Sequence, residues 1–131
     1  MMRVVRIVLH LLKMGYHAFA AHPSMKKALF VCSQNRLRSP TAEAVFAAWP
    51  NVATDSAGLA PDATVRLSSE QIAWADIIFV MEKAHRNKLS KRFSRHLKGK
   101  RIVCLAIPDD YAFMDPALVR LLEARAGSLL K

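Results

Sequence analysis

A cysteine and an arginine stand six positions apart in the segment "LFVCSQNRLRSP", which covers residues 29–40. Cys32 supplies a thiol that can act as a nucleophile, and Arg38 supplies a planar guanidinium that can hold two phosphate oxygens at once. A phosphate dianion needs several donors, and the backbone N–H groups of the loop between the two residues could provide them. The spacing therefore predicts a phosphate-binding loop whose cysteine attacks the bound group.

The loop is expected to carry a positive electrostatic field, because its N–H groups, Arg38 and the N-terminus of the following helix all contribute to it. This field favours the thiolate form of Cys32, which is the nucleophilic form. Ser39 could donate its hydroxyl to the sulfur, and Asn35 tolerates the left-handed backbone conformation of a tight loop. The candidate phosphate-binding residues are Ser33, Gln34, Asn35, Arg36, Leu37, Arg38 and Ser39.

The cysteine–arginine spacing is a weak signal by itself, and a buried strand-end cysteine followed by surface arginines would look the same. The elements around the loop strengthen the functional interpretation. A strand-like apolar run at 28–31 precedes it, and Ser39-Pro40 follows it as a helix start. Here Ser39 is expected to cap the helix, with Pro40 at its first position.

Apolar strand-like segments alternate with amphipathic helix-like segments from Lys26 onward. This alternation predicts a three-layer α/β/α fold with a four-stranded parallel sheet, and it puts the phosphate-binding loop after the first strand. Ligands of such folds bind beyond the carboxyl ends of the strands, where Cys32 lies. The expected strands are 28–31, 52–57, 77–81 and 101–107, and the expected helices are 40–49, 68–76, 82–93 and a last one that opens at 115–116.

The loop resembles that of the low-molecular-weight protein tyrosine phosphatases, which reads C-x-G-N-x-C-R-S-P. Cys32, Asn35, Arg38, Ser39 and Pro40 stand at the matching positions. The resemblance extends over residues 25–131. It includes "TAEAVF" at 41–46, "DSAGL" at 55–59, "ADIIFVMEKAHRNKL" at 75–89 and "DDY" at 109–111, where the family has D-P-Y.

The resemblance implies a two-step phosphatase reaction that needs neither a metal nor another cofactor. Cys32 would attack phosphorus while Asp109 protonates the departing phenol, and a cysteinyl-phosphate would form. Asp109 would then accept a proton from the water that hydrolyses this intermediate. The resemblance also implies that Tyr111 stands at the rim of the substrate crevice, with Asp110 beside it in place of the family's proline.

Three departures from the family pattern affect the functional interpretation. Gln34 replaces a glycine, Leu37 replaces a cysteine that can form a protective disulfide in relatives, and the segment 61–67 is shorter than usual. They keep open a non-catalytic module that binds phosphate or a phosphoprotein. An arsenate reductase on the same fold is a weaker alternative, because it needs two further redox cysteines and only Cys104 remains.

Composition limits the class of protein and its ligands. The chain has 131 residues, 53% of them hydrophobic, which fits one domain with a packed core. Lys and Arg number 20 against 10 Asp and Glu, and the resulting net charge of +10 favours anionic ligands. We expect a phosphorylated protein or a small phosphomonoester as substrate. The two cysteines form no disulfide framework, which indicates a reducing, cytoplasmic setting.

Residues 82–101 contain nine Lys or Arg against Glu82 alone. A nucleic-acid surface would need stacking aromatic residues, and Phe93 falls on the apolar helix face instead. We therefore interpret this stretch as a solvated basic face and expect no nucleic-acid partner. His85 is expected to pack against or cap its helix, and Cys104 is expected in the core.

The first 24 residues contain basic residues but no acid. An apolar run followed by Ala18-Phe19-Ala20 resembles a signal peptide, although His10 and Lys13 interrupt it, and an amphipathic surface helix is a second interpretation. The run is too short to span a bilayer. We favour a third interpretation, in which residues 1–24 lie upstream of the true start at Met25. The expected domain is therefore 25–131, preceded by a basic and apolar extension.

Overall fold

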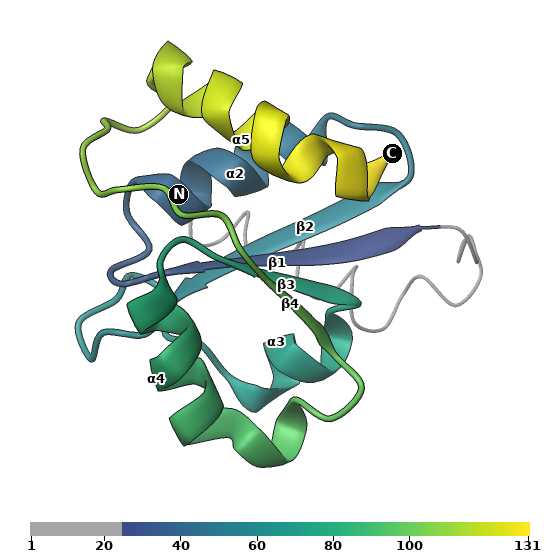
Figure 1. The fold of residues 1–131 in the computed structure, drawn as a ribbon, viewed down its shortest axis with the longest axis vertical. Coiled ribbons are helices and arrows are strands. Elements are labelled where there is room, and N and C mark those ends of the chain that lie inside the picture. The colour runs from purple at the N-terminus through teal and green to yellow at the C-terminus, as the bar shows by residue number, and fades with distance from the viewer. Residues whose placement is uncertain (1–24) are drawn as a thin grey trace.

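The computed structural model describes residues 25–131, and the predicted extension 1–24 lies outside the described residues. Strands and helices alternate along the chain (Figure 1). In order they are β1 (Lys26–Cys32), α2 (Arg38–Ala47), β2 (Val52–Gly58), α3 (Ser69–Trp74), β3 (Ile77–Val80), α4 (Lys83–Phe93), the 3₁₀ helix η2 (Ser94–His96), β4 (Arg101–Cys104) and α5 (Pro116–Leu130). No helix in this part of the chain is long and apolar enough to cross a membrane.

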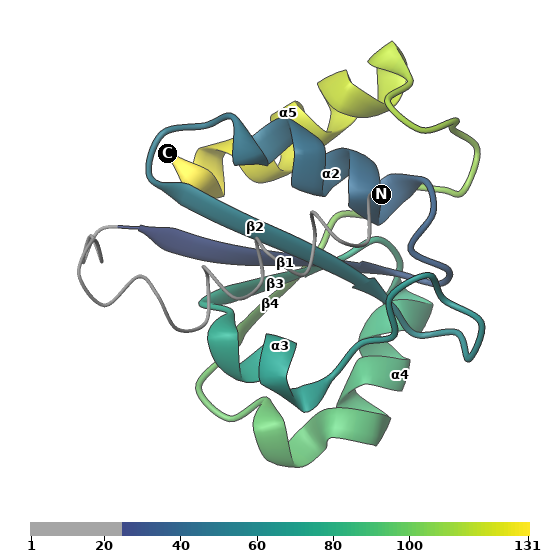
Figure 2. The ribbon, with the colours of Figure 1, turned by 180° about the vertical axis from the view of Figure 1, so that it is seen from behind.

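The four strands form one parallel sheet in the order β2-β1-β3-β4. Helices α2 and α5 cover one face of it, and α3 and α4 cover the other (Figures 1 and 2). The predicted three-layer architecture is therefore confirmed. Because the chain leaves β1 toward one face and β3 toward the other, a crevice can open beyond the carboxyl ends of these neighbouring strands, and Cys32 lies at that edge.

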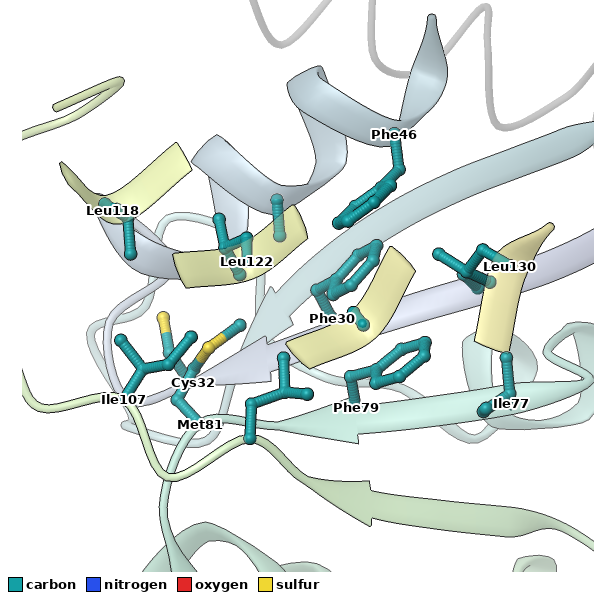
Figure 3. Packing of buried hydrophobic residues seen from close by; sticks show 14 of the residues in the cluster. Phe30, Cys32, Phe46, Ile77, Phe79, Met81, Ile107, Leu118, Leu122 and Leu130 are labelled. Atoms are coloured by element: carbon teal, nitrogen blue, oxygen red, sulfur yellow. The ribbon is translucent and has the colours of Figure 1, made fainter. Parts of the chain in front are cut away.

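Apolar side chains on the two faces of the sheet form two clusters. On the α2 and α5 face, Phe30 stacks between Phe46 and Phe79 with ring centroids 5.6 and 5.1 Å away (Figure 3). Leu118 and Leu122 of α5 complete this cluster. On the opposite face, side chains of β1 and β3 pack against α3 and α4, and this cluster includes Leu29, Val31, Ile72, Ile78 and Leu89. Every central strand is thus buried on both faces, as its continuous apolar sequence predicted.

The start of α2 differs from the sequence prediction. The helix begins at Arg38, with Leu37 at the N-cap, so Ser39 is not the capping residue and Pro40 occupies the third helical position instead of the first. The proline is still accommodated, because the first four N–H groups of a helix have no intrahelical acceptor. Ser39 Oγ contacts the sulfur of Cys32 and therefore is not used to cap the helix.

The end of β4 also differs, since the strand stops at Cys104 and not at Ile107. Ala106 has a φ of 54°, in the left-handed region, which interrupts the extended backbone. Backbone contact with the neighbouring strand nevertheless continues: Leu105 N donates to Val80 O and Ile107 N donates to Met81 O, each at 2.8 Å. The segment after β4 is thereby kept at the carboxyl edge of the sheet.

The helix starts beyond α2 follow the sequence signals. Ser68 Oγ accepts from Gln71 N at 3.2 Å, and Gln71 Oε1 accepts from Ser68 N at 3.1 Å, which forms the capping box of α3. Asp115 Oδ1 accepts from Ala117 N at the start of α5. These caps fix where each helix leaves the sheet, and with it the loop that precedes the helix.

The stacked phenylalanines give a direct test of the core. Phe30 is fully buried, whereas Phe113 is 45% exposed. We expect Phe30→Ala to lower the free energy of unfolding by about 3–5 kcal/mol, because it leaves a cavity between two rings. The same truncation at Phe113 should change it by less than about 0.5 kcal/mol. Urea denaturation of the two variants measures both, and equal losses would contradict this description of the core.

Candidate active site

The loop after β1 encloses the sulfur of Cys32. Asn35 N donates to Cys32 Sγ at 3.2 Å, and Ser39 Oγ lies 2.9 Å from the same sulfur. Asn35 Nδ2 donates to Ser39 Oγ at 3.0 Å, and the serine's own hydrogen can be donated to the sulfur or to Ala57 O, which lies 3.5 Å from Ser39 Oγ. Cys32 is buried at the end of the core cluster, beside Met81 and Ile107 (Figure 3). The backbone N–H of Asn35 and the hydroxyl of Ser39 thus both contact the sulfur at the floor of the loop.

Asn35 fixes the shape of the loop. Its φ of 56° lies in the left-handed region, which asparagine tolerates better than most residues. Its side chain also donates to Ser56 Oγ at 2.9 Å, and Ser56 Oγ in turn donates to Glu43 Oε1 at 2.5 Å. The sequence reasoning missed Ser56 and Glu43, which lie within the "DSAGL" and "TAEAVF" segments.

Gly58 at the end of β2 allows the loop to lie against the sheet. A Cβ atom at this position would be 2.4 Å from Ser33 O and 3.0 Å from Asn35 N, both backbone atoms. Any larger residue would therefore displace the loop. Gln34, by contrast, does not adopt a positive φ, and its Oε1 accepts from Arg36 Nη1 at 3.0 Å. The absence of the family's glycine at this position therefore introduces no backbone strain.

Groups that follow β3 and β4 hold the side chain of Arg38 in place. Its side chain is only 3% exposed, and its Nη1 donates to Glu82 Oε2 at 2.6 Å and to Ile107 O at 2.7 Å. Its Nε lies 3.6 Å from Asp109 Oδ1. The hydrogen bond from Arg38 holds the pKa of Glu82 below its ordinary value. Sequence reasoning missed Glu82, although a single acid directly after a buried strand, at the carboxyl edge of the sheet, was a usable signal.

His85 connects α4 to the loop. Its Nδ1 accepts from Glu82 N at 3.1 Å, and its Nε2 lies 2.9 Å from Ser33 Oγ. Burial lowers the pKa of this histidine, and the positive charge of Arg38 lowers it further. The neutral ring is therefore favoured. The structure agrees with the predicted role of His85, which packs and caps at the start of α4.

A pocket of about 340 Å³ opens in front of the loop. Asp109, whose side chain is 62% exposed, faces it from the segment after β4. The lining residues are Cys32, Ser33, Gln34, Arg36, Leu37, Arg38, Ala60 and Asp109. Of the two other predicted rim residues, Asp110 is exposed and Tyr111 is half-buried against the core, and neither lines the pocket. Within residues 25–131 no group of three or more His, Cys, Asp or Glu is placed to hold a metal.

A larger hollow of about 770 Å³ lies at the opposite end of β1. Its walls contain no cysteine and no acidic side chain; they are Lys26, Ala48, Trp49, Pro50, Asn51, Leu130 and Lys131. The volume of a pocket therefore does not identify the candidate site in this protein. The smaller pocket is the one that combines a nucleophile, a buried cation and a carboxylate.

Several solved structures share this fold, and some of them are named as phosphatases. The chain is similar to Vibrio vulnificus Wzb in complex with benzylphosphonate, at 26% identity and a TM-score of 0.65, over 81% of this chain and 97% of that one. It is also similar to SP-PTP, a low molecular weight protein tyrosine phosphatase from Streptococcus pyogenes, at 17% identity and a TM-score of 0.67, over 82% and 95%.

A third similar structure is the YwlE arginine phosphatase from Geobacillus stearothermophilus, at 22% identity and a TM-score of 0.64, over 79% of this chain and 92% of that one. No protein-family model matches the sequence, and no curated protein matches it. The resemblance drawn from the sequence is confirmed by the fold. The chain has the architecture of the low-molecular-weight protein tyrosine phosphatases, with Cys32 in the loop after the first strand.

The buried histidine predicts a pH dependence of stability. Its folded-state pKa is lowered below about 6.5, so the unfolded chain takes up a proton at a pH where the folded chain does not. The contribution of His85 to the free energy of unfolding is therefore complete above its unfolded-state pKa of about 6.5. It decreases as the pH falls from that value toward the lower folded-state pKa, by at most about 1.4 kcal/mol per pH unit for one proton. We expect His85→Gln to flatten this slope in urea titrations between about pH 5 and 7.

His96→Gln supplies the matched control, because it removes an exposed imidazole instead of a buried one. If the free energy of unfolding depends on pH equally in the His85 variant and in the original chain, His85 is not the group responsible for that dependence.

The two cysteines predict how the protein responds to oxidation. Cys32 belongs to the cluster on the α2 and α5 face, whereas Cys104 packs against the opposite cluster and is half-buried instead of lying in the core. β3 separates their strands, which places their Cα atoms about 10 Å apart, beyond the roughly 7 Å limit for a disulfide. Mass spectrometry of the peroxide-treated folded protein should find no Cys32–Cys104 disulfide, and a stoichiometric one would disprove this geometry.

Proposed function

We propose that the protein hydrolyses phosphomonoesters through a cysteinyl-phosphate intermediate and acts as a protein tyrosine phosphatase. The observation that carries this proposal is the convergence of Cys32, Arg38 and Asp109 on one pocket, with the sulfur inside a loop that follows a parallel strand. The similarity to Wzb and to SP-PTP supports it.

One edge of the Arg38 guanidinium, formed by Nε and Nη2, makes no hydrogen bond within residues 25–131, although Nε forms an ion pair with Asp109. Arginine has five N–H donors, and both hydrogens of Nη1 are used by Glu82 and Ile107. Nε and Nη2 remain, and they form the edge that binds two oxygens of one phosphate. Nε is also the atom nearest to Asp109. A phosphate held by this edge would therefore have its leaving oxygen close to the carboxyl group.

In the first step, Cys32 Sγ forms a bond to phosphorus while the bond from phosphorus to the phenol oxygen breaks. The loop N–H groups and Arg38 would stabilise the charge on the non-bridging oxygens. Asp109 would transfer its proton to the departing oxygen, so that a neutral phenol leaves. Ser39 would donate to the sulfur, which limits its negative charge before the attack and when it departs in the second step.

In the second step, a water oxygen forms a bond to phosphorus and the bond between sulfur and phosphorus breaks. Asp109, now ionised, would accept the proton of this water, and inorganic phosphate would be released with Cys32 returned to its thiolate form. Each of these transfers uses side chains of this chain alone, so the proposal requires no metal or organic cofactor.

The departures from the family loop do not weaken this proposal. Gln34 adopts an ordinary backbone conformation, and Leu37 lines the pocket without blocking it. Gln34 therefore no longer argues for a non-catalytic module, whereas the shortened segment 61–67 still does, and the turnover assays separate the two functions. An arsenate reductase is disfavoured because the other cysteine of the chain lies on the opposite face of the sheet.

The substrate is proposed to be a protein phosphotyrosine, with phosphoarginine and small phosphomonoesters as the alternatives to be tested. Turnover of a phosphotyrosine peptide, a phosphoarginine peptide and p-nitrophenyl phosphate by the pure protein separates these classes. We place this activity in the cytoplasm, because an unpaired thiol nucleophile works in a reducing compartment.

The role of Asp109 can be tested through the leaving group. A general acid matters most when the leaving oxygen is basic. We therefore expect Asp109→Asn to slow hydrolysis of phenyl phosphate by about 10²–10⁴-fold and that of p-nitrophenyl phosphate much less. The neighbouring Asp110→Asn is the matched control, and it should keep the original leaving-group dependence. A steeper dependence in the Asp110 variant would reverse the two roles.

Cys32→Ser tests the nucleophile in the same assays. It should abolish turnover of all three substrates and still bind inorganic phosphate, because the loop donors remain. Wild-type activity in this variant would contradict the proposed role of Cys32 as the nucleophile.

A further inference from the structure

Ser33 lines the pocket, one residue after the nucleophile. Its hydroxyl oxygen lies 2.9 Å from His85 Nε2, and it has no other hydrogen-bond partner within residues 25–131. The proposed phosphate site uses the backbone N–H of Ser33 but gives its side chain no role. Which of the two atoms donates in the contact with His85 decides what that side chain can do.

The second ring nitrogen of His85 settles the direction of this hydrogen bond. Nδ1 accepts the backbone N–H of Glu82 at 3.1 Å, so it carries no hydrogen. A neutral imidazole then has its hydrogen on Nε2, which must donate to Ser33 Oγ. Burial of His85 and the nearby charge of Arg38 both lower its pKa and favour this neutral ring.

The serine hydroxyl therefore has a hydrogen to give and an oxygen already held in place. A serine oxygen accepts through its lone pairs and donates through one hydrogen. Because the contact with His85 occupies a lone pair, the hydrogen of Ser33 has no acceptor within residues 25–131, and Ser33 belongs to the lining of the pocket. A phosphoryl group held over Cys32 in the same pocket would be an anionic acceptor for this hydrogen.

We propose that the Ser33 hydroxyl donates a hydrogen bond to a non-bridging oxygen of the bound phosphoryl group, and that His85 is the positioning residue that orients it. This inference rests on the proposed phosphate site. The hydrogen bond adds one side-chain donor to the backbone N–H groups and the Arg38 edge, and it forms no new covalent bond. A hydrogen bond to an anionic oxygen is stronger than a neutral one.

The position of the hydrogen on His85 Nε2 also excludes Ser33 as a nucleophile activated by His85. To activate Ser33, His85 would have to accept the serine proton on Nε2, but that nitrogen already carries a hydrogen. Ser33 is therefore a donor to the ligand and does not compete with Cys32 for phosphorus.

The first experiment measures the tautomer of His85 without any ligand. Long-range ¹H–¹⁵N correlation spectra of the wild-type protein at about pH 7.5 distinguish Nε2–H from Nδ1–H imidazoles. We expect the Nε2–H form for His85. The Nδ1–H form would overturn the proposal, because the serine would then donate to the ring and have no hydrogen for the phosphate.

The second experiment measures the affinity for inorganic phosphate by calorimetry, in chains that carry Cys32→Ser so that no intermediate forms. We expect Ser33→Ala to weaken binding about ten-fold and Ser33→Thr, which keeps the hydroxyl, to restore most of the affinity. Ser90→Ala on the exposed side of α4 is the control for an unrelated hydroxyl. Circular dichroism confirms that each variant is folded at the temperature of the titration.

Unchanged phosphate affinity in a folded Ser33→Ala chain would overturn the inference, and so would failure of the threonine to restore it. The comparison is independent of turnover. If the wild-type protein binds phosphate but does not hydrolyse p-nitrophenyl phosphate, the proposed function fails while the affinities still decide the role of Ser33.

Discussion

The candidate site depends on one tight turn of the backbone around a sulfur atom. The chain must pass from the end of β1 to the start of α2 while it points N–H groups inward, and the left-handed conformation of Asn35 makes this possible. The same residue donates from its backbone to Cys32 and from its side chain to Ser39 and Ser56. The loop, the first turn of α2 and the end of β2 are therefore held by a single side chain, and Gly58 provides the space it needs.

The remaining parts of the site come from the two strands on the other side of β1. Glu82 follows β3, and Ile107 and Asp109 follow β4. They meet around Arg38 because the carboxyl ends of parallel strands share one edge of the sheet. The ion pair between Arg38 and Glu82 is only partly buried, so we assign it an orienting role and not a large contribution to stability. It sets which edge of the guanidinium faces the pocket.

Local sequence signals were sufficient for the elements and for the loop. Continuous apolar runs predicted the buried strands, and serine and aspartate caps predicted the helix starts, because these effects act within a few residues. The predicted capping role of Ser39 was wrong, whereas its predicted contact with the sulfur is present, because a serine before a proline looks the same in the sequence in either role. The end of β4 was placed too late because nothing in its apolar run signals the left-handed conformation of Ala106.

The contacts that the sequence could not predict are those between distant segments. Glu82 and Arg38 are 44 residues apart, and His85 and Ser33 are 52 residues apart. Each pairing depends on the strand order, which brings β3 next to β1. The spacing of residue types within one segment carries no information about such a pairing, so the contacts of Glu82 with Arg38 and of His85 with Ser33 emerged only from the three-dimensional arrangement.

The separation of the two cysteines by the sheet has a consequence for the protein in a cell under oxidative stress. A sulfenic acid at Cys32 would find no neighbouring thiol in its own chain, because Leu37 stands in the loop and Cys104 lies on the other face. Its rescue would then fall to small diffusible thiols, which must reach the sulfur through the pocket before a second oxidation makes the damage permanent. The concentration of that thiol pool, and not the chain itself, would set how long the protein stays inactive.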